Sequence, residues 1–452
     1  MSTTPAVPAP RAASPARLRL SSLLRRPIAD RGGESIGRLS DVIVRLRGAD
    51  DPVVTGLVAA VGGRAVFVPI DQVASLGTGE PGGPGPGGPG TVDGGLRLTS
   101  AKLDLRRFER REGEVLLRAD VLGHRLIDVE SAHLIRAGDL ELAWRAGDWV
   151  VSGVDSHRRA RRLPWSPAAA GDERDHGFRE WAKFEPLIGH TGSALLRGPF
   201  GRIRRLKPAQ IADLLEDASK DEETEILGQV HADPELEADV FEELDEDLAT
   251  RLLGARTDRE IAGVLARMRA DDAADAIAEL PQRRRQPVLD LLPPGPRAKV
   301  LTLMGYNPTS AGGLMGMDFV ALPADASVAA AIEAVAAATT LQPEALTSVH
   351  ALDARGRLAG VSKLVGLLQA DRAAPLAAVC DDDPVRVGAD TDAVDVAVLM
   401  SDYNLITVPV VDERRMMIGV ITVDDVLEVT LPEDWRRREA AQPPDAHRGA
   451  PE

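Results

Sequence analysis

The sequence predicts a multidomain α+β protein: small β-barrels at the N-terminus, an all-α superhelical or solenoid domain in the middle, and a repeated α/β unit at the C-terminus. Three observations lead to this prediction. Apolar and polar residues alternate with period two through much of residues 21–165, whereas the period becomes 3.6 from residue 195 to 303. Residues 318–430 then contain an internal repeat. A chain of 452 residues can hold about three or four domains of roughly 100–150 residues each.

Composition favours a cytoplasmic location. Cys380 is the only cysteine, so the chain forms no intramolecular disulfide, which suits a reducing compartment. The sequence has no run of roughly 18–20 uninterrupted apolar residues, and its N-terminus lacks the apolar core of a signal peptide. We therefore expect a soluble cytoplasmic protein without a membrane span of its own. Residues 1–20 and 432–452 are expected to be disordered tails.

The N-terminal β region is expected to consist of two units joined to the rest by a linker. The expected bounds are 21–110 for the first β domain, with a Gly/Pro-rich loop at 77–95, 111–165 for the second β unit, and 166–194 for the linker. Residues 36–42 and 122–129 share a G-x-x-h-x-D-V pattern, with one extra residue in the second copy. This hairpin is similar to the opening of PRC-barrel domains. The alternative is two unrelated small β units.

A basic run, Arg158-Arg159-Ala160-Arg161-Arg162, closes the β region. Such a run can contact RNA or anionic lipid. Because no aromatic residues interleave with it to stack on bases, a solvated linker is favoured.

The helical domain is expected over residues 195–315. Leu215, Leu244 and Leu280 anchor successive helical units, at spacings of 29 and 36 residues. That loose period is typical of a solenoid, in which each helix pair buries its apolar stripe against its neighbours.

The C-terminal repeat has an offset of 59 residues. The segment 349–360 aligns with 408–419, and each copy is predicted to follow the order β-α-β-β-α. This order resembles a pair of CBS domains, with copies at 316–374 and 375–431. The resemblance implies that the copies pair into one disc and that the chain forms a homodimer through it.

The junction between the helical domain and the repeat reads YNPTSAGGLM, from Tyr306 to Met315. The order of helical domain, junction and paired repeat resembles the cytosolic half of the MgtE magnesium channels. In that family a membrane pore follows the second repeat, whereas this sequence ends at Glu452. The expectation is therefore a soluble MgtE-like sensor without its channel, acting on a separately encoded membrane transporter. Tyr306, Ser310, Gly312 and Gly313 are the predicted hinge residues, with a plain linker as the alternative.

Charge is divided unevenly along the chain. Residues 1–210 hold 32 basic and 24 acidic residues, a net charge of +8, whereas residues 211–452 hold 22 and 46, a net charge of −24. An acidic half is unsuited to nucleic acid and suited to cations, although acidic helices can also be merely well solvated. The sequence contains no HExxH, P-loop or metal-binding CxxC pattern, so we expect no enzyme activity.

Two acidic clusters are the predicted Mg²⁺ ligands, because Mg²⁺ prefers oxygen and often needs only one or two carboxylates. Both lie at expected helix starts, and their members are Asp271, Asp272, Asp275, Asp424, Asp425 and Glu428. The family resemblance implies that Mg²⁺ screens the repulsion between the helical domain and the CBS pair and draws them together. The alternative is helix capping, at about 0.5–2 kcal/mol per cap.

A nucleotide cleft is the second predicted site. Residues 419–425 match the G-h-x-T/S-x-x-D pattern of CBS domains that bind adenosine nucleotides, which implies that Thr422 and Asp425 contact the ribose of ATP or AMP. Lys363 and Gly366 stand at the corresponding positions of the first copy, so at most one such site is expected. A Thr/Asp helix cap is the alternative.

The leading hypothesis is a non-enzymatic, Mg²⁺-responsive regulatory protein related to magnesium transport. The first alternative is an adenosine-nucleotide-sensing CBS regulatory protein. The second is an RNA- or ribosome-associated adaptor that works through the PRC-barrel-like units. Two departures from the family pattern weaken cation binding near the C-terminus: Pro432 breaks the last helix, and Asn404 stands after Tyr403 in place of an acidic residue.

Overall fold

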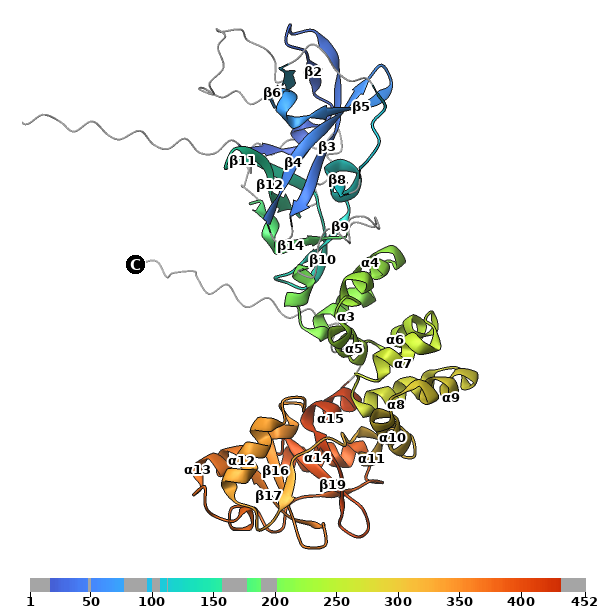
Figure 1. Cartoon of the computed structure of the whole chain (residues 1–452), viewed down its shortest axis with the longest axis vertical. Helices are drawn as coiled ribbons and strands as arrows, with labels where there is room; N and C mark the ends of the chain where they lie inside the picture. The colour runs from blue at the N-terminus through green and yellow to red at the C-terminus, as the bar shows by residue number, and fades with distance from the viewer. Residues whose placement is uncertain are drawn as a thin grey trace, which may run out of the picture. The chain divides into compact units, whose positions relative to one another are not determined.

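The computed structural model describes residues 17–47, 50–76, 96–99, 106–111, 113–156, 177–187 and 201–431. The chain separates into two compact units, Met1–Asp245 and Glu246–Glu452, which are described one at a time (Figure 1). The loop expected at 77–95, the basic run at 158–162, the C-terminal tail and the first 16 residues lie outside the described residues.

Most strands of the first unit belong to one large sheet that curls into half a barrel (Figure 1). Its main path runs in the order β1-β11-β12-β4-β3-β2-β7-β6, and β5, β8 and β13 pair with β4, β3 and β12. The bounds are β1 Arg17–Arg19, β2 Pro27–Ala29, β3 Ser35–Arg47, β4 Asp50–Val61, β5 Arg64–Pro69, β6 Val73–Ser75, β7 Leu96–Leu98, β8 Glu114–Leu116, β11 Asp139–Arg145, β12 Asp148–Asp155 and β13 Arg179–Glu180.

A smaller sheet in the same unit has the order β10-β9-β14. It is formed by β9 (Arg125–Asp128), β10 (His133–Arg136) and β14 (Phe184–Pro186). The short helical turns among these strands are α1 Leu20–Leu23, η1 Ile70–Gln72, the π-helical turn η2 Leu117–Val121, and η3 Trp181–Lys183.

The β region corrects the expectation of separate small barrels. Strands from 21–110 and from 111–165 pair within one sheet, with Val150 of β12 opposite Val53 of β4. The expected tail contributes β1, which pairs with β11, and the expected linker contributes β13 and β14. One apolar core runs through all of these segments and includes Trp181 and Phe184. The physical reason is size, since a β unit of roughly 55 residues is only marginally stable alone and gains from sharing a larger core.

The first unit ends in helices. They are η5 (Arg202–Arg205), α3 (Pro208–Asp217), α4 (Lys220–Val230) and α5 (Pro234–Glu242). Pro208 and Pro234 occupy first-turn positions, where a missing N–H leaves no hydrogen bond unmade. Arg125 of β9 pairs with Glu222 of α4 at 2.5 Å, which ties the small sheet to the helices.

The second unit begins with helices that continue the 3.6-residue pattern. They are α6 (Glu246–Gly254), α7 (Asp258–Leu265), α8 (Ala270–Glu279), α9 (Gln282–Leu291), α10 (Pro294–Leu303) and α11 (Ala311–Leu314). Helices two places apart pack together: α6 on α8, α7 on α9, and α8 on α10. The predicted anchors Leu215, Leu244 and Leu280 are all buried. The boundary at Asp245 falls inside the helical domain expected over 195–315.

The predicted double β-α-β-β-α order is confirmed in the rest of the second unit. The first copy holds β15 (Ala321–Pro323), α12 (Val328–Ala337), β16 (Ser348–Leu352), β17 (Leu358–Lys363) and α13 (Leu364–Gln369). The second holds β18 (Val387–Gly388), α14 (Ala393–Tyr403), β19 (Thr407–Val411), β20 (Met417–Thr422) and α15 (Val423–Thr430). Each forms a three-stranded sheet. At equivalent positions 59 residues apart, the Thr407 hydroxyl donates to the Ser348 hydroxyl oxygen at 2.8 Å.

Among the helices within the described ranges, none has both the length and the apolar character that a bilayer crossing requires.

Candidate functional site

The acidic clusters predicted at two helix starts meet around one arginine. Arg269, which directly precedes α8, donates through Nε to Asp272 at 2.6 Å and through Nη2 to the same carboxylate at 3.1 Å. Its Nη1 donates to Oδ1 of Asp425, in the first turn of α15, at 2.8 Å. Asp271 lies 3.8 Å from Nη2. One guanidinium therefore contacts carboxylates from both helices.

The other oxygen of Asp425 is bound within its own helix. The Thr422 N–H and hydroxyl both donate to Asp425 Oδ2, at 2.8 and 2.9 Å. This is a capping box, and both side chains are buried. The structure thus brings together the two residues predicted to contact ribose, and it satisfies each carboxylate oxygen of Asp425 with a different donor.

Burial is the largest electrostatic effect in this cluster. It disfavours charge on Arg269, but the carboxylates of Asp272, Asp271 and Asp425 outweigh it, so the pKa of Arg269 lies above its ordinary value. Burial raises the pKa of Asp271, and the neighbouring charge of Asp272 adds to that effect. Burial likewise raises the pKa of Asp425, although Arg269 and the hydrogen bonds from Thr422 oppose the shift. The hydrogen bonds of Arg269 hold the cluster together, and they offset the free-energy cost of removing these charged groups from water.

The remaining predicted ligands are more exposed. Asp275 is exposed one turn along α8, where partial desolvation and the charges of Asp272, Glu246 and Glu279 raise its pKa to about 6. Asp424 and Glu428 are exposed on α15. Within the described ranges, no group of three or more His, Cys, Asp or Glu residues is arranged to hold a metal ion.

Sequence reasoning missed Arg269 itself. The signal was present, because Arg269 stands three residues before Asp272, a spacing at which helical side chains meet. Its contact with Asp425 could not be predicted from the local sequence, because the two residues are 156 positions apart.

The predicted hinge residues form a tightly packed elbow against the second repeat. The Gly312 N–H donates to the Ala389 carbonyl at 2.8 Å, and the Gly316 N–H donates to the Val420 carbonyl at 2.9 Å. A Cβ at Gly312 would lie 2.6 Å from the Tyr306 ring, and one at Gly313 would lie 2.3 Å from the Asn307 carbonyl oxygen. The Ser310 hydroxyl donates to the same Asn307 carbonyl at 2.8 Å. Close approach of the Tyr306 ring explains Gly312, and close approach of the backbone at Asn307 and Pro308 explains Gly313.

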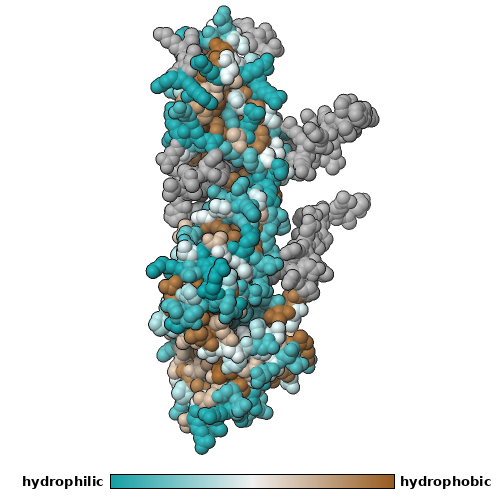
Figure 2. Space-filling view, turned by 90° about the vertical axis from the view of Figure 1, so that its right-hand side faces the viewer, coloured by the Kyte–Doolittle hydropathy of each residue, from teal (hydrophilic) through white to brown (hydrophobic). Residues whose placement is uncertain are grey.

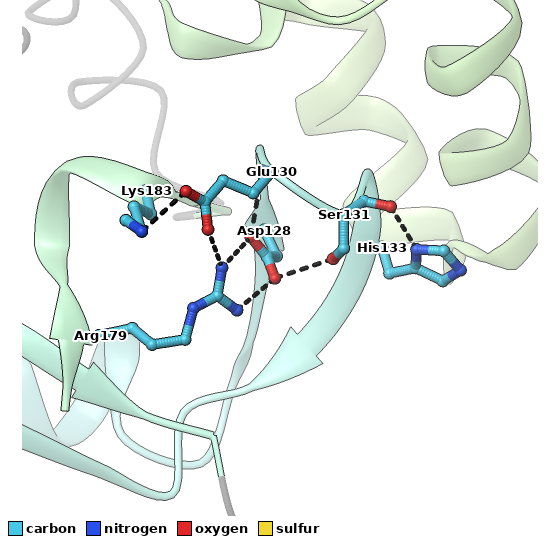
Figure 3. Close-up of polar contacts among 6 residues, drawn as sticks. All are labelled: Asp128, Glu130, Ser131, His133, Arg179 and Lys183. Carbon is cyan, nitrogen blue, oxygen red and sulfur yellow. Dashed lines mark hydrogen bonds and ion pairs between the residues drawn. The ribbon is translucent and has the colours of Figure 1, made fainter. Parts of the chain in front are cut away.

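The aspartates of the two G-x-x-h-x-D-V hairpins have a structural role in the first unit. Asp128 accepts two hydrogen bonds from Arg179, at 2.5 and 2.8 Å, and a third from the Ser131 hydroxyl (Figure 3). Glu130 continues the network to Arg179 and Lys183 (Figure 3). Although burial opposes the shift, the bonds from Arg179 and Ser131 hold the pKa of Asp128 below its ordinary value.

Asp41 occupies the matching place in the first hairpin. It is buried and accepts from the backbone N–H groups of Arg118 and Ala119, at 2.7 and 3.1 Å. Each aspartate therefore fastens a neighbouring turn to the sheet.

Comparison with known proteins identifies two domains. Residues 206–309 match the MgtE intracellular N domain, and residues 376–432 match the CBS domain. The magnesium transporter MgtE of Thermus thermophilus is 37% identical over 164 residues, which are 35% of this chain and 36% of that protein. The MgtE of Bacillus subtilis is 22% identical over 231 residues, 51% of each chain. This chain thus spans about a third to a half of these relatives.

One solved structure is similar to half of this chain. The crystal structure of the cytosolic domain of the Mg²⁺ channel MgtE in complex with ATP is 29% identical to this chain, with a TM-score of 0.47, over 50% of this chain and 92% of that one. Residues 206–309 and 376–432 are thus similar to the MgtE intracellular N domain and to the CBS domain, and a third of the chain is similar to a magnesium transporter MgtE.

Proposed function

We propose that residues 206–432 form a cytoplasmic, non-enzymatic, Mg²⁺-responsive regulatory module related to magnesium transport. Cation binding would draw the helical domain onto the CBS pair. The observation that carries this proposal is the order of the two matched domains, together with 37% identity to a magnesium transporter over 164 residues. A separately encoded membrane transporter is the proposed target.

The acidic face of α8 supports a cation response. Partial desolvation raises the pKa of Asp275, and repulsion from the charges of Asp272, Glu246 and Glu279 adds to this effect. Mg²⁺ keeps most of its waters and binds through one or two carboxylates, so a hydrated ion needs no preformed cage of ligands here. Asp424 and Glu428, exposed on α15, offer further carboxylates to the same ions.

The test is limited proteolysis of the purified chain across a Mg²⁺ titration at constant ionic strength. We expect cleavage in the junction at 304–318 to slow as Mg²⁺ binds, with a weaker effect in Asp275→Asn. Asp382→Asn is the matched control, because it removes an equal charge from an exposed loop of the same unit. Cleavage that is unaffected by Mg²⁺ in the unmodified protein would end the proposal.

A second function, adenosine-nucleotide sensing, is suggested by the G-h-x-T/S-x-x-D pattern at residues 419–425. In the structure the Thr422 hydroxyl and the Asp425 carboxylate bind each other at 2.9 Å in the buried cap of α15, so a ribose would have to replace this bond and the bond from Arg269. Lys363 and Gly366 replace them in the first copy, so one ATP or AMP per chain is expected. Calorimetry with ATP and AMP tests this function. Binding by the unmodified chain that is lost in Thr422→Ala/Asp425→Ala supports it, and no heat of binding excludes it.

Dimerisation through the CBS pair is proposed from its apolar surface. Figure 2 shows apolar side chains at the surface among polar ones. Large apolar side chains that are exposed on α13, α14 and α15 include Val365, Leu368, Val394, Val398, Leu427 and Val429. Helices α14 and α15 pack together, and exposed apolar side chains on adjoining helices are typical of a subunit interface.

A further inference from the structure

Arg269 is the common partner of the acidic residues that meet between α8 and α15. The Asp271 and Asp425 side chains are 9% and 6% exposed, and that of Arg269 is 22% exposed. Buried carboxylates at such positions need a positive partner, because removing it leaves uncompensated charges in a medium of low polarity. The guanidinium supplies this partner from within the chain.

Without Arg269 the approach of the two helices would be unfavourable. Asp271 and Asp272 belong to the first turn of α8, and Asp425 belongs to the first turn of α15. These like charges would converge on the space that the guanidinium fills, and repulsion at close range grows as the surroundings become less polar. The contact between α8 and α15 therefore depends on positive charge at this point.

The guanidinium is well suited to the task. It presents five donors in a planar fork and keeps its charge at every physiological pH. Here its three nitrogens donate hydrogen bonds to carboxylates on two helices. A second ion pair, Lys299 with Asp318, also joins the helical part to the first copy, but both side chains are largely exposed, so it contributes little.

We propose that Arg269 acts as a tethered cation that holds α8 against α15 without any divalent ion, and we call this contact the Arg269 clamp. Removing the guanidinium should free the carboxylates of Asp271, Asp272 and Asp425, and the same contact should then require Mg²⁺. The clamp concerns the same pair of domains as the proposed function. It leaves the face around Asp275 as the place where the unmodified chain responds to Mg²⁺.

The test is hydrogen exchange of the full chain, followed on peptides from residues 270–280 and 423–431. In EDTA we expect both segments to be protected in the unmodified chain and to exchange roughly tenfold faster in Arg269→Gln, since about 1.4 kcal/mol corresponds to a factor of ten. Added Mg²⁺, at constant ionic strength, should restore protection in Arg269→Gln.

Arg284→Gln is the matched control. Arg284 of α9 binds Asp258 of α7 at 2.7 Å, so its loss removes an equivalent ion pair from the same unit and should leave residues 423–431 unchanged. Asp425→Asn tests the clamp from the other side. It removes the negative charge that Arg269 binds on α15, and the remaining amide oxygen can still accept the hydrogen bonds from Thr422. If the clamp exists, Arg269→Gln and Asp425→Asn together should cost less protection than the sum of their separate effects.

Three results would overturn the clamp: protection of residues 423–431 in the unmodified chain only when Mg²⁺ is present, no change at these residues in Arg269→Gln, or faster exchange in that variant that Mg²⁺ does not reverse. The proposed function fails on a different result, the absence of any Mg²⁺ effect on the junction of the unmodified chain. The two ideas can therefore fail separately.

Discussion

Asp275 combines an exposed side chain with a crowded electrostatic environment. Partial desolvation and the charges of Asp272, Glu246 and Glu279 raise its pKa to about 6, from an ordinary value of 3.8. Between these two values the folded chain holds more protons than the unfolded chain. This residue's contribution to stability is therefore present at low pH and is lost as the pH rises through about 6.

We expect Asp275→Asn to raise the unfolding temperature of the second unit at pH 7.5 and to have little effect near pH 4. The reason is that the substitution removes a charge that is unfavourable only when ionised. Calorimetry at the two pH values measures the difference, with Asp382→Asn as the control. An equal shift at both pH values would mean that Asp275 acts through packing.

His350 titrates in the opposite sense. It is fully buried on β16, and its Nδ1 lies 3.0 Å from the Val320 carbonyl oxygen. Among the described residues, its Nε2 has no hydrogen-bond partner. Burial lowers the pKa of His350 from 6.5 to about 4, despite the hydrogen bond to Val320. In that window the unfolded state binds more protons, so stability is lost as the pH falls from about 6.5 to 4.

We expect the free energy of unfolding of His350→Phe to fall less than that of the unmodified chain as the pH falls from about 6.5 to 4. From the size of the pKa shift, the difference is roughly 3 kcal/mol at most. The variant should be somewhat less stable at pH 8, where it lacks only the hydrogen bond to Val320. Urea unfolding at pH 8 and pH 4.5 tests the prediction. An acid-side decline as steep as that of the unmodified chain would show that other groups cause it.

The sequence predicted which carboxylates gather between α8 and α15, but it did not predict the residues that they contact. Asp271, Asp272 and Asp425 were expected at helix starts, and the structure brings them together. Arg269 and His350 could not be assigned roles in advance, since a buried ion pair and an unpartnered ring nitrogen depend on contacts between distant parts of the chain.

At the scale of the element, the junction helix α11 depends on its two glycines in different ways. A Cβ at Gly312 would meet the Tyr306 side chain, which can move, whereas one at Gly313 would meet the backbone of Asn307 and Pro308, which cannot move easily. Overpacking of this kind typically costs about 1–3 kcal/mol.

We expect Gly313→Ala to destabilise the second unit more than Gly312→Ala does. Adding Tyr306→Ala to Gly312→Ala should recover part of the loss, and adding it to Gly313→Ala should not. Thermal unfolding of the four variants, with Tyr306→Ala alone as the reference, measures these effects. Equal losses for both glycine variants would indicate a flexible linker in place of a packed elbow.

Element types followed from periodicity, but strand partners did not. Period two predicted the strands of the first unit, and period 3.6 predicted its helices. The joining of both β segments into one sheet rests on pairs such as Arg17 with Ala143 and Gly153 with Glu180. Pairing over such separations is set by how the apolar faces share a core, which local patterns do not encode.

At the scale of the whole molecule, the proposed dimer makes a direct prediction. Val394 and Val398 of α14 are 61% and 53% exposed, and we expect Val394→Asp/Val398→Asp to convert a dimer into a monomer, because charges are costly in an apolar interface. Sedimentation equilibrium at several concentrations measures the change. Leu301→Asp, at an exposed apolar residue of α10, is the control and should leave the mass unchanged. A monomeric unmodified chain would exclude the dimer.

The order of the large parts was predictable: β region, helices and double repeat appear as expected. The division into compact units was not, because its boundary at Asp245 lies inside the run of helices. The described helices on either side of the boundary carry the same 3.6-residue pattern, so the sequence offers no signal for where such a run divides.

The Arg269 clamp also affects which contacts of the chain can respond to ion concentration. A bound ion leaves when its concentration falls, so a contact bridged by an ion reports that concentration. A guanidinium attached to the same chain cannot be diluted, and its effective concentration at Asp425 is set by chain geometry alone. This one contact therefore does not depend on the concentration of a divalent ion, and any signal must come from carboxylates other than those that Arg269 binds.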